Sequence, residues 1–290
     1  MPESNTILKI ELPMKLRFNE KPTTNFVDVI KNIRVTALIR PKSNIKDILY
    51  DYMNATWADY PIHFKTTESV QEQFELLLQG KALPSALECI QYLFLLEGIT
   101  IQEVTHILRH RMATFSAQCS GDLWWSHHDA IIPESISKSK FKSRYKKLTK
   151  DCKKLYCDMI DSKKVSIMDA RYILTRNLTT FYYMRMDLGN ILQFIKQRKC
   201  TQIQPATDNK LAELMYNIIC EDFPEIKKYV SLKCDSSCHY VKTANTGKAT
   251  NLYLPDRAHD IFEYNKDNFI YQKTRKQMGE SYNFQEDINL

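Results

Sequence analysis

Glycine is scarce in this sequence, and its placement excludes two common phosphate-binding loops. The chain has six glycines in 290 residues, namely Gly80, Gly98, Gly121, Gly189, Gly247 and Gly279. No two lie close enough to form a G-x-G-x-x-G or a G-x-x-x-x-G-K loop, and both loops need glycines to bring backbone N–H groups to a phosphate. The sequence therefore disfavours a Rossmann dinucleotide site and a P-loop NTPase. If the protein binds phosphates, side chains must bind them.

Long hydrophobic runs are also missing. The longest apolar run is Tyr92 to Leu96, which is far too short for a membrane span. The first residues lack a basic region followed by an apolar core, so we expect no signal peptide. Eight cysteines are scattered without a framework, which indicates free thiols and a cytoplasmic protein.

The composition is that of a globular protein with a mild basic excess. Hydrophobic residues make up 43% and charged residues 26%, which argues against wholesale disorder. Lysine plus arginine number 41 against 34 acidic residues, a net charge of +7. This excess suits an anionic ligand, but a solvated surface rich in lysine explains it equally well.

Hydrophobic periodicity divides the chain into three parts. Residues 1–44 are predicted to be rich in strands, with alternation over 7–12, 26–30 and 33–38. Residues 45–230 are mainly helical and contain every motif discussed below. Residues 231–290 are polar and aperiodic, so we expect an appended tail with modest structure.

Helical spacing predicts several helices in the middle part. The positions expected to face inward are Ile45, Ile48, Leu49 and Tyr52 after a cap at Ser43; Val70, Phe74 and Leu77 before Gly80; Val104, Ile107 and Leu108 after a Thr100–Glu103 capping box; and Phe141, Tyr145, Leu148, Cys152, Leu155 and Met159 in one long helix. The stretch from Ser85 to Leu96 fits either a strand or a buried helix.

Three segments together resemble a known enzyme family. Residues 109–119, which begin Arg-His-Arg, resemble the R-H-R-x7-S signature of the flavin-dependent thymidylate synthases (the ThyX type). Residues 170–178 and 192–198 are similar to that family's A-R-x-x-L-P-x-N-L and N-F-L-x-L-R segments, and residues 85–88 stand where the family has T-P-F-E. The resemblance covers roughly residues 45 to 230.

This resemblance implies both a fold and a reaction. The fold would be α+β, with a ThyX-like helical core, a small antiparallel sheet and active sites built between the subunits of a homotetramer. The reaction would be methylation at C5 of dUMP, a pyrimidine nucleotide. FAD would be the cofactor, with methylenetetrahydrofolate and NADPH as co-substrates.

The resemblance also implies site residues. The catalytic candidates are Arg198, His110, Cys119 and Ser120. The cofactor candidates are Arg109, His110, Arg111, Ser85, Glu88, Asp187 and Gln193. The substrate candidates are His106, Arg111, Cys119, Ser120, Gly121, Arg171 and Arg198. No metal site is expected, because Cys234, Cys238 and His239 form at most half of a zinc site.

Read without the family, the same residues have alternatives. Arg109 and Arg111, two positions apart near a helix end, point in different directions and suit two separate anions. They could equally complement a helix dipole. Arg198 could be a surface arginine at the end of a helix, and Glu88, in an apolar neighbourhood, needs a partner or a function.

Several positions depart from the family pattern and indicate a divergent member. Cys119 replaces the signature serine, although Ser120 follows it, and Asp122 stands where the family has an arginine on the nucleotide phosphate. His106 replaces a glutamine, and Gly189 replaces a flavin-binding arginine. Another pyrimidine nucleotide or another C5 modification is therefore the alternative substrate or reaction.

A third reading is a protein that binds nucleic acid or a partner without catalysis. Its evidence is the basic run from Lys138 to Lys154 and the polar tail. A solvated helix face explains the run better, so binding of nucleic acid is not expected. The adjacent Trp124 and Trp125 could stack on a base or a flavin, or be buried.

Overall fold

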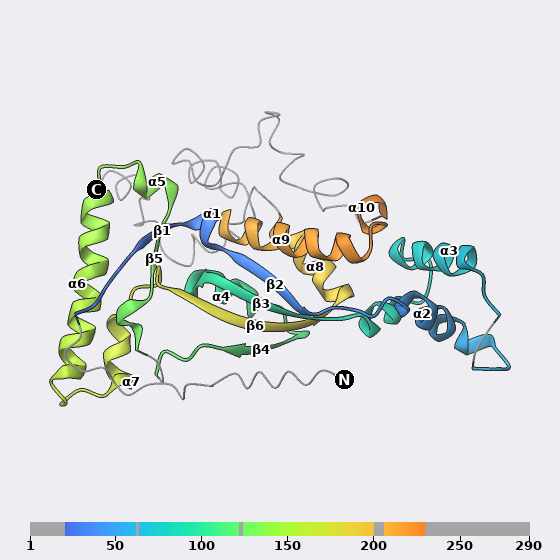
Figure 1. Cartoon of the computed structure of the whole chain (residues 1–290), viewed down its shortest axis with the longest axis horizontal. Coiled ribbons are helices and arrows are strands. Elements are labelled where there is room, and N and C mark those ends of the chain that lie inside the picture. The colour runs from blue at the N-terminus through green and yellow to red at the C-terminus, as the bar shows by residue number, and fades with distance from the viewer. Residues whose placement is uncertain (1–20, 62–63, 122–123, 200–205, 230–290) are drawn as a thin grey trace, which may run out of the picture.

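A computed structural model describes residues 21–61, 64–121, 124–199 and 206–229 (Figure 1). A four-stranded antiparallel sheet in the order β2-β3-β6-β4 forms its centre, and a two-stranded parallel sheet pairs β1 with β5. The expected strand over 7–12 and the tail over 231–290 lie outside the described residues. No helix in the described ranges is long and apolar enough to cross a bilayer.

The strands and helices have the following bounds. The strands are β1 Phe26–Asp28, β2 Arg34–Ile39, β3 Gln91–Thr100, β4 Ala113–Ala117, β5 Ala130–Ile132 and β6 Thr179–Asp187. The helices are α1 Val29–Asn32, α2 Ile45–Asn54, α3 Thr67–Leu78, α4 Ile101–Ile107, α5 Glu134–Ser137, α6 Lys142–Asp161, α7 Ile167–Ala170, α8 Leu188–Arg198, α9 Ala206–Asp222 and α10 Ile226–Tyr229. Short 3₁₀ turns cover Ala55–Trp57, Pro84–Cys89, Trp125–His127 and Arg171–Ile173.

The α+β class and the small antiparallel sheet are confirmed. The undecided stretch 85–96 divides into a 3₁₀ turn and the first half of β3. Alternate residues of β3 and β6 face one core, where Phe94 and Met184 are fully buried beneath Phe194 of α8 and Leu211 of α9. Pairing along the whole of β3 and β6 makes these two strands the rigid centre of the molecule.

Among the described residues, no second layer covers the opposite face of this sheet. Leu95 lies directly across from Tyr183, and Glu97 lies across from Phe181. Tyr183 and Phe181 keep 36% and 37% of their surface exposed. A sheet normally buries its apolar face against another layer, so this face is suited to contact a further chain.

Some predicted helix faces are wrong in detail. In α2, Leu49 and Met53 are buried, while Ile48 and Tyr52 are exposed. In α4 the capping box forms as predicted, but Leu108 follows the helix and is exposed. The strand expected over 26–30 ends at Asp28, where α1 begins. In α3 the predicted inward positions are all buried, where the helix packs against α2, α10 and the 3₁₀ turn Pro84–Cys89.

The long helix α6 turns a different face inward from the one predicted. Phe141, Leu148 and Leu155 are 55%, 53% and 45% exposed, and Tyr145, Cys152 and Met159 are half-buried. The buried residues of α6 are instead Thr149, Lys153, Tyr156, Cys157 and Ile160. They pack in a second core with Trp124, Trp125 and Leu178, so both tryptophans are core residues.

Lys153 explains part of this rotation. Its ammonium group is fully buried and donates to the carbonyl oxygens of Thr23 at 2.7 Å and His128 at 2.5 Å. Burial lowers the pKa of Lys153 to about 8, and Asp129 opposes that shift. The lysine therefore ties α6 to two segments that no local pattern connects to it.

Gly98 is expected to be the least replaceable glycine among the described residues. It has φ +71° at a bulge in β3, and an added Cβ would lie 2.2 Å from the carbonyl oxygen of Asn32. Gly98→Ala should lower the free energy of unfolding by at least about 2 kcal/mol, measured by denaturant titration. Gly80→Ala is the matched control, since Gly80 has φ +73° in open space and should cost only about 1 kcal/mol. Equal effects would contradict the steric argument.

Candidate functional site

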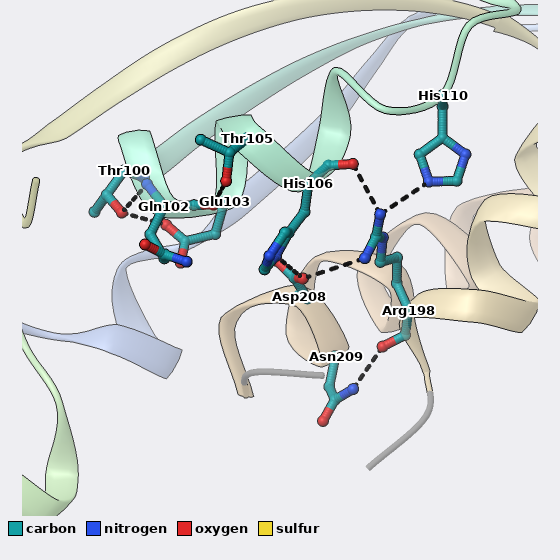
Figure 2. A network of polar contacts seen from close by, with 9 residues as sticks. All are labelled: Thr100, Gln102, Glu103, Thr105, His106, His110, Arg198, Asp208 and Asn209. Carbon is teal, nitrogen blue, oxygen red and sulfur yellow. Dashed lines mark hydrogen bonds and ion pairs between the residues drawn. The ribbon is translucent and has the colours of Figure 1, made fainter. Parts of the chain in front are cut away.

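A buried arginine at the end of α8 forms the centre of the candidate site (Figure 2). Asp187 caps the helix by accepting from the backbone of Asn190 at 2.9 Å. The apolar face of α8, with Leu188, Ile191 and Ile195, lies in the core and carries the last turn inward. Arg198 is consequently only 7% exposed, which excludes the surface-arginine alternative.

Arg198 is held by groups from three elements. Its Nη2 donates to the carbonyl oxygen of His106 at 2.8 Å and lies 3.4 Å from Nε2 of His110. Its Nη1 lies 3.8 Å from Oδ2 of Asp208 on α9. Burial lowers the pKa of Arg198 and the Asp208 carboxylate opposes this, but a guanidinium remains charged. The result is a fixed cation with a preset orientation.

Asp208 is the site residue that the sequence motifs miss. Its side chain is 2% exposed and its Oδ2 lies 2.6 Å from Nδ1 of His106. Burial raises the pKa of Asp208 to about 6, although His106 and Arg198 oppose the shift. No sequence pattern singles out Asp208, because it reaches His106 only through the packing of α9 beside α8.

The capping box at the start of α4 positions His106. Glu103, which is 3% exposed, accepts from the backbone N–H of Thr100 at 2.7 Å. This contact, shown in Figure 2, fixes the first turn of a seven-residue helix. His106 in the last turn then faces α9, and His110 follows just beyond the helix end.

His110 is a neutral imidazole at neutral pH. Its ring meets Phe194 edge-on with centroids 4.8 Å apart. Burial lowers the pKa of His110 to about 4, and the charge of Arg198 adds to the shift. The ring can therefore stack or accept a hydrogen bond without adding a second charge beside Arg198.

The remaining cofactor candidates differ in their exposure and in their partners. Arg109 and Arg111 are exposed beside this cluster, and Gln193 is exposed on α8. Ser85 is half-buried, with its hydroxyl 3.2 Å from that of Tyr52. Glu88 is exposed, so the expectation that an apolar neighbourhood forces a partner on it is wrong. Asp187 is occupied with the N-terminus of α8.

A second cluster contains the candidates after β4. Cys119 is exposed, and its sulfur accepts from the backbone of Gly121 at 3.4 Å. A Cβ on Gly121 would lie 2.3 Å from Sδ of Met168 and 3.1 Å from Nη1 of Arg171. A side chain at this point would have to displace the ends of Met168 and Arg171. Ser120 is half-buried beside them, and Asp122 lies outside the described residues.

The two clusters come from different parts of the fold. Arg171 precedes the first residue of β6, and α8, which carries Arg198, follows its last residue. Helix α8 folds back over the core, however, and Arg198 donates to His106, six residues beyond Thr100, which pairs with Thr179 at the start of β6. Arg198 therefore lies over the middle of the sheet and not at the end farthest from Arg171.

Acid should reveal the buried state of His110. The unfolded imidazole has a pKa of about 6.5, and the folded one about 4. Folding thus favours the neutral form, so this contribution to stability is complete above about pH 6.5 and is lost as the pH falls toward 4. His110→Gln should flatten the fall in unfolding free energy over that range, measured by urea titrations at several pH values. An unchanged pH dependence would place the titration elsewhere.

Comparisons with known proteins find similarity to one enzyme family. A family model described as "Thymidylate synthase complementing protein" matches residues 45–225. A flavin-dependent thymidylate synthase of Nitratidesulfovibrio vulgaris is 25% identical over 159 residues, which are 52% of this chain and 64% of that protein. One of Clostridium tetani is 23% identical over 202 residues, covering 64% of this chain and 81% of that one. The chain thus spans somewhat less than two thirds of the Nitratidesulfovibrio relative.

Two solved structures share the fold. One is the UMP/dUMP methylase PolB from Streptomyces cacaoi bound with 5-Br dUMP, with a TM-score of 0.59 at 13% identity. It covers 71% of this chain and 98% of that one. The other is ThyX from Helicobacter pylori complexed with FAD and dUMP, with a TM-score of 0.53 at 12% identity over 68% of this chain and 100% of that one.

Proposed function

The chain belongs to the thymidylate synthase complementing protein family, and from this premise we propose that it is a flavin-dependent enzyme that modifies C5 of a uridine nucleotide. The observation that carries the proposal is the buried Arg198 between His106, His110 and Asp208. An oriented guanidinium can pair with the edge of a pyrimidine and stabilise negative charge that develops on the ring. The activity of the related flavin-dependent thymidylate synthases supports this proposal.

The residues around Arg198 also fit a flavin. Arg109 and Arg111 are exposed cations two positions apart, so that one could bind the flavin pyrophosphate and the other the nucleotide, and His110 is a neutral ring between them. When bound, reduced FAD would supply a hydride. The chain's own part would be to bind both ligands, to hold the uracil ring through Arg198, and to keep the charge near the ring fixed.

The finer reaction in this proposal is conversion of dUMP to dTMP. Methylenetetrahydrofolate would supply the methylene group, the flavin hydride would complete the methyl group, and C5 would lose its proton. NADPH would reduce the flavin again. Arg171 with Cys119, Ser120 and Gly121 would bind the nucleotide at its phosphate end, on a loop where Gly121 admits the arginine.

The proposed site is shared between copies of the chain. In this proposal Arg198 comes from one copy and Arg171 from another, within the homotetramer that the family resemblance implies. The exposed Phe181 and Tyr183 on the open sheet face offer an apolar surface for contact between copies.

One observation favours a different pyrimidine as the substrate. His106 stands where the family has glutamine, and its ring is paired with the buried Asp208. An imidazole tied to a carboxylate presents a different hydrogen-bonding edge from an amide. A cytosine nucleotide, or another modification at C5 such as hydroxymethylation, is therefore the second candidate. Product masses from dUMP, dCMP and UMP would separate the candidates.

The visible absorption spectrum of the purified protein tests the proposal. With FAD added, we expect a bound-flavin spectrum that shifts when dUMP is added. A flavin spectrum that responds to dCMP but not to dUMP would favour the second candidate. Failure to bind flavin under any condition would contradict the proposal and favour a binding protein without catalysis.

Cys119→Ser tests the role of the exposed thiol. If Cys119 only replaces the family's hydroxyl, the variant should keep or raise the turnover of dUMP, because a hydroxyl forms stronger hydrogen bonds than a thiol. Steady-state formation of dTMP measures this, with Cys89→Ser as a control at another exposed cysteine. An inactive Cys119→Ser protein that still binds flavin would instead indicate thiol chemistry.

A further inference from the structure

The outer face of α6 carries an apolar stripe. Phe141, Leu148 and Leu155 are each about half exposed, although the same helix buries Thr149 and a lysine, Lys153. Apolar surface that stays exposed to water costs free energy, and a contiguous exposed patch of it often marks a site of interaction. A helix that is buried on one side and exposes leucines on another is suited to pack against a further partner on its exposed side.

The spacing of this stripe is that of a seam between two helices. Its exposed members, Phe141, Leu148 and Leu155, recur every seven residues. Half-buried residues stand between and beyond them: the Tyr145 hydroxyl donates to the carbonyl oxygen of Ile131, Met159 packs on the chain's own second core, and Cys152 lies midway. A repeat of 3.5 residues keeps one side of a helix against a single partner helix over its length. With 20 residues, α6 offers a seam about 30 Å long.

The charges beside the stripe indicate the occupant. On its solvent side lie Arg144, Asp151 and Asp158, each three or four residues from Leu148 or Leu155. In a parallel pair this edge would face the other edge of the partner helix, where Thr149 and Tyr156 are buried in the chain's own core. An antiparallel copy brings Arg144 toward Asp158 in both directions, and these two opposite-charge pairs outnumber the single approach of Asp151 to Asp151 of the partner subunit near the axis. Lys147 and Lys154 lie roughly a third of a turn away from the stripe and do not oppose this pairing.

We propose that a second copy of the chain packs its α6 antiparallel against this stripe, about a two-fold axis near Cys152. Cys152 lies at the middle of α6, so the axis places it beside Cys152 of the partner subunit. Leu148 then packs against Leu155 of the partner subunit, and the reverse. This contact is separate from the sheet face, and two different two-fold contacts close a tetramer.

Matched substitutions test the surface. Leu148→Gln with Leu155→Gln should halve the mass of the assembly, measured by light scattering after gel filtration. Lys147→Gln with Lys154→Gln places the same side chain at the neighbouring exposed positions and should leave the mass unchanged. A mass unaffected by the leucine changes would overturn the proposal. A lower melting temperature without a change of mass would also overturn it, because another segment of the same chain would then cover the stripe.

Cross-linking tests the antiparallel arrangement directly. Diamide should join Cys152 to Cys152 of the partner subunit by removing two electrons and two protons from the two thiols, and Cys152→Ala should abolish this cross-link. In the Cys152→Ala background, Leu148→Cys alone should not cross-link, because an antiparallel helix places the two copies about 12 Å apart. Leu148→Cys with Leu155→Cys should cross-link. A cross-link with Leu148→Cys alone would indicate a parallel pair and overturn the proposal.

The flavin spectrum keeps this inference distinct from the proposed function. The leucine variant should still bind FAD and respond to dUMP, since the sheet-face contact and both clusters remain. Loss of the flavin signal in the wild-type protein would refute the proposed function alone, because mass and cross-linking do not depend on a ligand.

Discussion

Arg198→Ala is expected to abolish nucleotide binding while the assembly stays intact. The substitution removes a buried guanidinium whose hydrogen bonds to a pyrimidine would be assisted by charge. Each such bond contributes about 1.5–3 kcal/mol, so losing a two-pronged contact should weaken dUMP binding at least about 100-fold. The dUMP-induced change in flavin absorbance measures binding, and light scattering measures the assembly. Unchanged affinity for dUMP would refute the role of Arg198.

The loss of Arg198 must be separated from a defect in folding. Its removal leaves the Asp208 carboxylate buried with His106 as its remaining partner. An uncompensated buried charge is destabilising, so Arg198→Ala should also lower the unfolding midpoint. Arg198→Ala with Asp208→Asn removes both charges and should recover part of that midpoint without recovering dUMP binding. Arg198→Lys keeps the charge but loses the planar guanidinium, so its affinity for dUMP should lie between those of the wild-type protein and Arg198→Ala.

Mixing two inactive variants is expected to restore activity. If each site takes Arg198 from one copy and Arg171 from another, then Arg198→Ala and Arg171→Ala are each inactive alone. A hybrid pair contains one site with both arginines and one with neither. Random pairing of equal amounts should recover about a quarter of the wild-type activity for a two-fold pair. The measurement is dTMP formation after co-expression or after unfolding and refolding together.

A control distinguishes complementation from residual activity. Two preparations of the same variant, mixed in the same way, should remain inactive. A mixture that stays inactive, although mixed assemblies form, would show that both arginines of a site come from the same copy.

The local features of the chain were predictable from the sequence. The Thr100–Glu103 capping box and the buried face of α3 form as expected, since both depend on residues within one or two turns. The family was also recognisable, because the motifs at 109–119, 170–178 and 192–198 keep their order and spacing. The three-part division of the chain stays a prediction.

The site itself could be predicted only in part. The motifs single out His110, Arg171 and Arg198, but they say nothing of which residues surround each. Asp208 carries no motif, and Glu88 was expected to need a partner although it is exposed. Contacts with residues of distant elements cannot be inferred from the spacing of residues within one segment of the sequence.

By itself, the sequence determined that this protein is an α+β member of its family with a set of candidate arginines. Only the tertiary structure decided that Arg198 is buried against Asp208, that Arg171 lies beside Gly121, and that α6 buries Lys153 and exposes Leu148. The physical reason is that periodicity fixes which residues share a face of a helix or strand. Which face turns inward depends on the free energy of packing against elements far away in the chain.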